Sequence, residues 1–284
     1  MLTVVRHSSS SQIIIRLVMA MLTAALLVSR ASAEEPADTQ PPQKVESTAA
    51  VSAGAGMFLP TVIAPRVDSQ RGYVRMLGGY DSARRSVQFD VIGDITIIGP
   101  LAARVGAMYN QHPSAESGHE RPDKFRPSFG LRVQALSQEH HGIDLGIGAY
   151  YKPEGFTEAE GEIEAVLSLG RSFGRFVTFA NLVYGQDPEG KERDGEVRVG
   201  ALYAVSSLLY VGADARLRLD LGEEEGEERG AKVANRAEYD LVFGPTASYA
   251  WGPIAIIAQA GMSVFGTEPA RLGIVALGGL AGVL

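Results

Sequence analysis

Apolar and polar residues alternate along the chain from about residue 71 onward. In the stretch YVGADARLRLDL, residues 210–221, Val211, Leu217 and Leu219 fall on one face, and Asp214 and Arg216 fall on the other. Because successive side chains of a β-strand point to opposite faces, this period of two predicts strands. The pattern recurs to the end of the chain and predicts about twelve strands of roughly ten residues each.

The length of these strands and their connections favour a membrane barrel. Roughly ten residues suit a tilted strand that crosses a bilayer, whereas soluble sheets average about five or six. Except for the first connection, 81–84, which is short, long polar connections alternate with short ones. This is typical of outer-membrane barrels with turns on one side and loops on the other. The short connections are 99–100, 138–142, 171–174, 205–207 and 252–253, and the long ones are 110–126, 152–161, 186–195, 222–236 and 265–271.

Aromatic residues lie on the apolar face at both ends of the expected strands. Amphipathic rings settle at the two interfaces of a membrane, so this distribution predicts two aromatic girdles. The expected girdle residues are Tyr109, Tyr151, Tyr184 and Tyr239 at the long-loop ends, and Phe176, Tyr203, Tyr249 and Trp251 at the short-turn ends.

With strands, connections and aromatics of this kind, residues 70–284 resemble the porin-like outer-membrane β-barrels of Gram-negative bacteria. The resemblance rests on architecture and implies an all-β fold: a transmembrane, up-and-down antiparallel β-barrel of about twelve strands in the outer membrane. Its apolar face would contact lipid and its long loops would point outward. The alternative is a soluble β-sheet protein, in which the apolar face packs a core and the charges meet water.

The first 69 residues differ in pattern from the rest. Arg6 and Arg16 precede an apolar run at 17–28, and Ala31 and Ala33 follow it, which predicts a signal peptide over 1–33 cleaved after Ala33. An uncleaved anchor is the alternative. Residues 34–69 are rich in Pro, Ala and Ser and predict a flexible periplasmic segment. Within it, 50–63 is also compatible with an extra strand or a plug inside the barrel.

Charge and composition exclude several functions. The chain has 26 Lys and Arg against 33 Asp and Glu, and no Cys. The absence of Cys excludes disulfides and Cys-based metal sites or nucleophiles. An acidic exported protein lacks the basic surface that nucleic acid requires, so no nucleic-acid partner is expected. The expected partners are outer-membrane lipid and, for one candidate function, periplasmic envelope proteins; the oligomeric state stays open.

If the apolar face meets lipid, the charged face lines the lumen, the space that the strands enclose. A three-residue loop at 205–207 would place Asp214 opposite Arg198, and Arg216 opposite Glu196. The same reasoning at residues 98–100 places Asp94 opposite Arg104. These charges would form either a constriction that selects solutes or a lattice that rigidifies the barrel. The full set is Asp90, Asp94, Arg104, Arg132, Glu196, Arg198, Asp214, Arg216, Arg218 and Asp220.

No other motif indicates chemistry. The acidic loop 222–236 is interpreted as a solvated loop, with a calcium or other cation site as the alternative. The His-containing loop 110–125 is interpreted as solvated because its spacing matches no closed metal site. No catalytic residue, metal or cofactor is expected: the histidines lie in turns and loops, and no nucleophile motif occurs. The predicted function is a narrow porin-like channel for small solutes or ions. The alternative is a structural or anchoring subunit of an envelope machine for secretion, motility or polysaccharide export.

Overall fold

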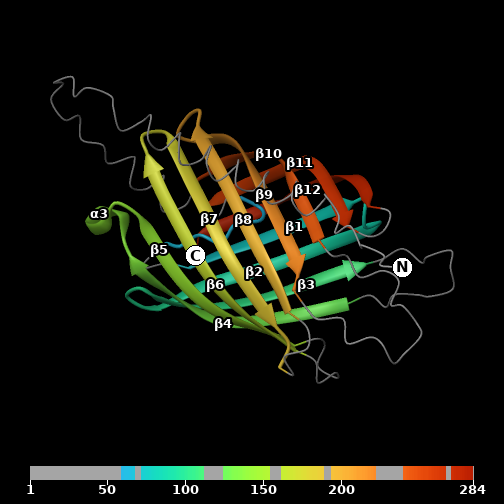
Figure 1. Ribbon diagram of the computed structural model, residues 1–284. Helices are drawn as coiled ribbons and strands as arrows, with labels where there is room; N and C mark the ends of the chain where they lie inside the picture. The colour runs from blue at the N-terminus through green and yellow to red at the C-terminus, as the bar shows by residue number, and fades with distance from the viewer. Residues whose placement is uncertain are drawn as a thin grey trace, which may run out of the picture. The chain divides into compact units, whose positions relative to one another are not determined.

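Twelve antiparallel strands form a closed barrel in which each strand pairs with its neighbours in sequence and β12 returns to β1 (Figure 1). The computed structural model describes residues 59–67, 72–111, 124–153, 161–188, 193–221, 239–266 and 270–283, all within one compact unit, Glu46–Leu284. The up-and-down barrel of about twelve strands is therefore confirmed. The strands are β1 Tyr73–Asp81, β2 Ser86–Ile98, β3 Leu101–Gln111, β4 Lys124–Leu136, β5 Asp144–Pro153, β6 Gly161–Phe173, β7 Phe176–Gln186, β8 Arg193–Ala204, β9 Leu209–Asp220, β10 Tyr239–Trp251, β11 Ile254–Gly266 and β12 Arg271–Val283.

The two faces of the wall have inverted polarity compared with a soluble protein. Leu131, Ile147 and Leu182 are exposed on the outside, whereas Asp94 and Asn181 are buried inside. Because an apolar surface of this extent is unfavourable in water, the outer face is suited to a bilayer. The soluble alternative, in which the apolar face is buried, is wrong. Within the described residues, no helix is long and apolar enough to cross a membrane.

At the short-turn end of the barrel, tight turns join adjacent strands. Gly99 and Gly252 adopt positive φ angles of 50° and 58° and are each followed by proline, which lets two residues join adjacent strands. The connection between β4 and β5 contains the single helical turn α3, Gln138–His141. At the opposite end, apart from the turn 82–85, the connections lie wholly or partly outside the described residues.

The register between β8 and β9 differs from the expected one. Arg198 lies opposite Arg216, and Glu196 opposite Arg218, so the expected facing pairs Asp214–Arg198 and Arg216–Glu196 are wrong. The turn comprises residues 205–208, where the backbone N–H groups of residues 205 and 206 both donate to the carbonyl oxygen of residue 209. This longer turn shifts the register by two residues and leaves the inward face unchanged.

The register between β2 and β3 is the expected one. Asp94 lies opposite Arg104, and this pair is confirmed. The two-residue turn at 99–100 sets Ile98 opposite Leu101, and continued without interruption this register would place Asp94 opposite Val105. An irregularity between Thr96 and Ile98 shifts the register by one residue and brings Arg104 opposite Asp94.

Residues 59–67, here called the lumenal segment, lie against the inner wall. Leu59 and Val62 are fully buried in an apolar cluster with inward-facing side chains of the strands. Residues 59–63 are the described part of 50–63, the stretch also compatible with an extra strand or a plug. They form no strand and lie against the wall, as residues 64–67 do. Residues 34–58 and the predicted signal peptide lie outside the described residues. The cluster also contains Leu77, Val177, Phe179, Leu202, Tyr210, Ala255, Ile257 and Ala281.

Candidate functional site: the lumen

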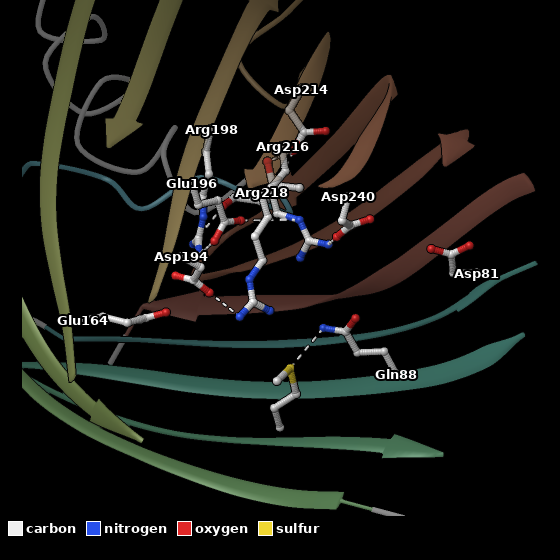
Figure 2. A network of polar contacts seen from close by, with 12 residues as sticks. Asp81, Gln88, Glu164, Asp194, Glu196, Arg198, Asp214, Arg216, Arg218 and Asp240 are labelled. Atoms are coloured by element: carbon white, nitrogen blue, oxygen red, sulfur yellow. Dashed lines mark hydrogen bonds and ion pairs between the residues drawn. The ribbon is translucent and has the colours of Figure 1, made fainter. Parts of the chain in front are cut away.

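A charge cluster lines the long-loop half of the lumen on β8, β9 and β10. Arg198 donates to Glu196 at 2.9 Å between Nη2 and Oε2. Arg216 donates to Asp240 at 2.5 Å between Nη2 and Oδ2, and its Nε lies 3.4 Å from Oε1 of Glu196. Figure 2 shows the three guanidinium groups converging among these carboxylates. The charge cluster is Asp194, Glu196, Arg198, Arg216, Arg218 and Asp240.

The charge cluster contains one of the two pairs expected from the sequence. Arg216 and Glu196 are in contact, but diagonally, because the register is shifted. Arg218 pairs with Asp194 and is 47% exposed. Asp214 does not pair with Arg198; its carboxylate instead accepts hydrogen bonds from Thr61 and from the amide of Gln259.

The turn 82–85 adds a charge to the cluster that the sequence pattern did not reveal. Arg84 donates to Asp240, and Asp81 accepts from the hydroxyl of Ser263 at 2.6 Å. Burial, together with the positive charge of Arg216, lowers the pKa of the Arg84 guanidinium. A guanidinium stays protonated in proteins, so the cluster retains this positive charge. Strand alternation says nothing about turn residues, and therefore could not place Arg84 inside.

Carboxylates from β6 pair with a lysine from β5 at the same level. Lys152 donates to Glu164, and its Nζ lies 3.9 Å from Oε2 of Glu162. On the wall opposite β8, Gln88 faces the lumen from β2, and its amide donates to the sulfur of Met108 at 3.3 Å (Figure 2). Asp90 lies on the same face of β2, two residues further along the strand. Charges of both signs therefore surround this half of the lumen.

A second, fully buried group of charges lies nearer the short-turn end. Arg104 donates to both carboxylate oxygens of Asp94, at 2.8 and 2.6 Å, and to the hydroxyl of Tyr73 at 2.9 Å. Arg132 lies 3.5 Å from Asp94 and donates to the carbonyl oxygen of Ala64 at 2.5 Å. The carboxylate of Asp94 thus pairs with two guanidinium groups, and that of Arg132 also binds the lumenal segment.

The wall opposite the lumenal segment consists partly of glycine. A Cβ placed on Gly146 would lie 2.9 Å from the carbonyl oxygen of Pro65, and one on Gly170 would lie 2.7 Å from the Pro65 ring. A Cβ on Gly200 would lie 2.6 Å from the Leu59 side chain. Real Cβ atoms do not approach so closely, so side chains are missing from the wall where the segment lies.

The remaining expected lumen residue lies at the long-loop end. Asp220 is the last residue of β9 and lies opposite Asp194. The girdle residues all lie on the outer face. Tyr203 and Tyr239 are half-buried, and Phe176 packs on Tyr203 with ring centroids 4.8 Å apart. The exposed ones are Tyr109, Tyr151, Tyr184, Phe176, Tyr249 and Trp251. Their contact with lipid interfaces stays a prediction.

The described residues offer no other site. Among them, no group of three or more His, Asp or Glu side chains is placed to hold a metal ion. His140 and His141 are exposed in α3 at the short-turn end. Most of the acidic loop 222–236 and of the loop 110–125 lies outside the described residues, so those interpretations are untested.

Comparison with known proteins establishes the class of fold. No family model matches the chain, and no curated protein matches it in sequence. An outer-membrane channel from Pseudomonas putida F1 has a TM-score of 0.55 at 10% identity, covering 77% of this chain and 97% of that one. The NanC porin has a TM-score of 0.50 at 10% identity, covering 74% of this chain and 98% of that one. The chain therefore has the porin-like outer-membrane β-barrel fold, as the resemblance implied.

Proposed function

We propose that the protein is a narrow porin-like channel of the outer membrane for small polar solutes or ions, narrowed at rest by its own lumenal segment. Charged side chains of both signs surround the long-loop half of the lumen, as in the selective parts of other pores. The short-turn half is filled by the segment together with the apolar cluster. The two similar structures described above are a porin and an outer-membrane channel, which supports this choice.

One observation carries the proposal: the wall lacks side chains opposite the lumenal segment. A barrel that is sealed for rigidity alone can be filled by side chains of its own strands. Here Gly146, Gly170 and Gly200 leave room that a separate piece of chain occupies. That piece is held by hydrogen bonds, packing and the ion pair of Arg66 with Asp144, all of them noncovalent. Its withdrawal would therefore leave a passage along the glycine-lined wall.

Conductance tests the proposal. Leu59→Lys/Val62→Lys puts two charges into the apolar cluster near Arg75, which donates to the carbonyl oxygens of both positions. Burial of unpaired charge is unfavourable, so the segment is expected to leave the wall. Refolded full-length protein in planar bilayers should then show discrete current steps that are larger than those of the wild type.

A matched control adds the same charge elsewhere. His140→Lys/His141→Lys introduces two lysines at exposed positions of the short-turn end and should conduct like the wild type. A structural or anchoring subunit, the alternative function, predicts a barrel without steps in every variant. That result would overturn the channel proposal.

A further inference from the structure

The lumenal segment is held mainly through its backbone. Asn181 of β7 accepts from the N–H of Ile63 at 2.7 Å and donates to the carbonyl oxygen of the same residue at 2.8 Å. One carboxamide thus bonds both backbone groups of a single residue, as a residue of a neighbouring strand would. At this position the wall therefore recognises backbone groups of the segment and not a side chain.

The same kind of contact recurs along the rest of the segment. Asp214 accepts from the N–H of Thr61 at 3.0 Å, and Gln134 accepts from the N–H of Val67 at 3.0 Å. Arginines supply the donors: Arg75 bonds the carbonyl oxygens of residues 59 and 62, Arg132 that of residue 64 and Arg198 that of residue 61. Side chains from β1, β4, β7, β8 and β9 thus bind backbone groups over nine residues.

Backbone groups are common to all peptides, and most side chains of the segment meet glycine or apolar surroundings. The Thr61 hydroxyl is an exception, since it also donates to Asp214 at 2.9 Å. Pro65 lies against Gly146 and Gly170, and Leu59 and Val62 enter the apolar cluster. One side-chain contact adds charge specificity, since Arg66 lies 3.2 Å from Asp144. The chain bends at residues 60, 61 and 65, which lets one nitrogen of Arg75 reach the carbonyl oxygens of both Leu59 and Val62. A site of this composition favours a bent, non-helical chain with small or apolar side chains and a basic residue near its end.

We propose that the lumen contains a peptide-binding site, occupied in cis by residues 59–67, that binds a peptide from another molecule through its backbone when the segment withdraws. This inference rests on the proposed channel function and gives its substrate class as short peptides. The segment then acts as a tethered competitor, present at a high effective concentration that a free peptide must overcome.

Peptide binding to the full-length protein tests the site. The probe is a fluorescein-labelled peptide with the sequence of residues 59–67, LPTVIAPRV, with both ends blocked, and the readout is fluorescence anisotropy in detergent. The Leu59→Lys/Val62→Lys variant should bind it at least about tenfold more tightly than the wild type, because the tethered competitor is displaced. His140→Lys/His141→Lys should bind it like the wild type.

The control peptide differs only in two backbone atoms. It carries N-methyl groups at the positions of Thr61 and Ile63, which removes the backbone donors to Asp214 and Asn181. Every side chain is kept, including the Thr61 hydroxyl that also donates to Asp214. Loss of these bonds should weaken binding about tenfold or more. Equal binding of both peptides would overturn the proposal, as would equal binding to the double-lysine variant and the wild type.

A second variant keeps the test valid if the double-lysine variant does not fold. Ile63→Pro removes the N–H that Asn181 accepts without adding charge, so it loosens the segment and leaves the wall intact. Folding is checked by the slower migration of heated protein in gels. This variant should also bind the probe more tightly than the wild type, and unchanged binding in a folded Ile63→Pro protein would contradict the site.

The two proposals fail in different ways. Current steps in the double-lysine variant without peptide binding would leave the channel standing and remove the peptide site. Peptide binding without current steps would leave the peptide site standing and remove the channel, together with the role of peptides as its substrate. Where both hold, the unmodified peptide should block the steps at concentrations at which the N-methylated peptide leaves them open.

Discussion

The buried ion pair of Asp94 gives the sharpest prediction for stability. Asp94 is 2% exposed and neutralises Arg104 directly, with Arg132 at 3.5 Å. Asp94→Asn keeps the shape of the side chain and removes its charge, which leaves two guanidinium groups buried without a carboxylate between them. Removing one partner of a buried ion pair costs about 3–5 kcal/mol, so we expect a loss of about 3 kcal/mol or more in the free energy of unfolding.

Trp251 provides the assay, since it is the only tryptophan and is 78% exposed on the outer face. Its emission should shift when guanidinium chloride extracts the barrel from lipid vesicles, and the midpoint and slope give the free energy. Arg218→Gln is the comparison, because Arg218 is 47% exposed and its pair with Asp194 should contribute only about 0–1 kcal/mol.

A double-mutant cycle with Asp94→Asn and Arg104→Gln separates the pair from the rest of the site. The double variant should be more stable than Asp94→Asn alone, because it removes one of the stranded charges. If Asp94→Asn unfolds within about 1 kcal/mol of the wild type, the lumen around this pair is solvated well enough to replace the carboxylate, and the reasoning from burial is refuted.

Other variants test the outer face, the lumenal segment and the charge cluster. Leu131→Arg, in the middle of the outer face, should lower the free energy of unfolding from vesicles by about 2–4 kcal/mol. Leu272→Arg, near the loop end, should lower it by only about 0–1 kcal/mol. Equal losses would contradict the expected depths of these two residues in the membrane. Lipids brominated near the headgroup should quench Trp251 more than lipids brominated at the chain end, and the reverse order would contradict the girdle. Gly200→Leu should collide with Leu59 and raise the conductance, and an unchanged conductance would show that the segment yields without leaving. Glu196→Gln should raise the permeability of chloride over potassium roughly twofold, read from the reversal potential, and no shift would remove Glu196 from the solute path.

The outer face was predictable because it depends on neighbours in sequence only. Alternation assigns each strand residue to one face, and lipid requires every outward residue in the middle of the membrane to be apolar. Leu131, Ile147 and Leu182 satisfy this requirement without any knowledge of the register. The same alternation placed Asp94 and Arg104 inside, whereas their facing positions also depend on an irregularity between Thr96 and Ile98 that shifts the register set by the turn.

The contacts inside the lumen were less predictable because they join residues distant in sequence. Asp214 was expected to pair with Arg198 on the adjacent strand, yet it binds Thr61, which lies 153 positions away. Arg84 reaches Asp240 from a turn to which strand alternation does not apply. Apolar inward residues such as Phe179 and Ile257 interrupt the polar pattern, and nothing local indicates that they form one cluster.

The sequence by itself determined that the chain forms strands, which face of each strand meets lipid, and that the barrel closes with about twelve strands. Tertiary structure decided the register of β8 against β9 and the position of residues 59–67 in the lumen. The physical reason is the distance along the sequence over which each feature is decided. Alternation is a property of each strand and repeats along it, whereas register depends on how a turn closes. A segment without periodicity takes its position from the wall that binds it, and that wall exists only once the barrel has closed.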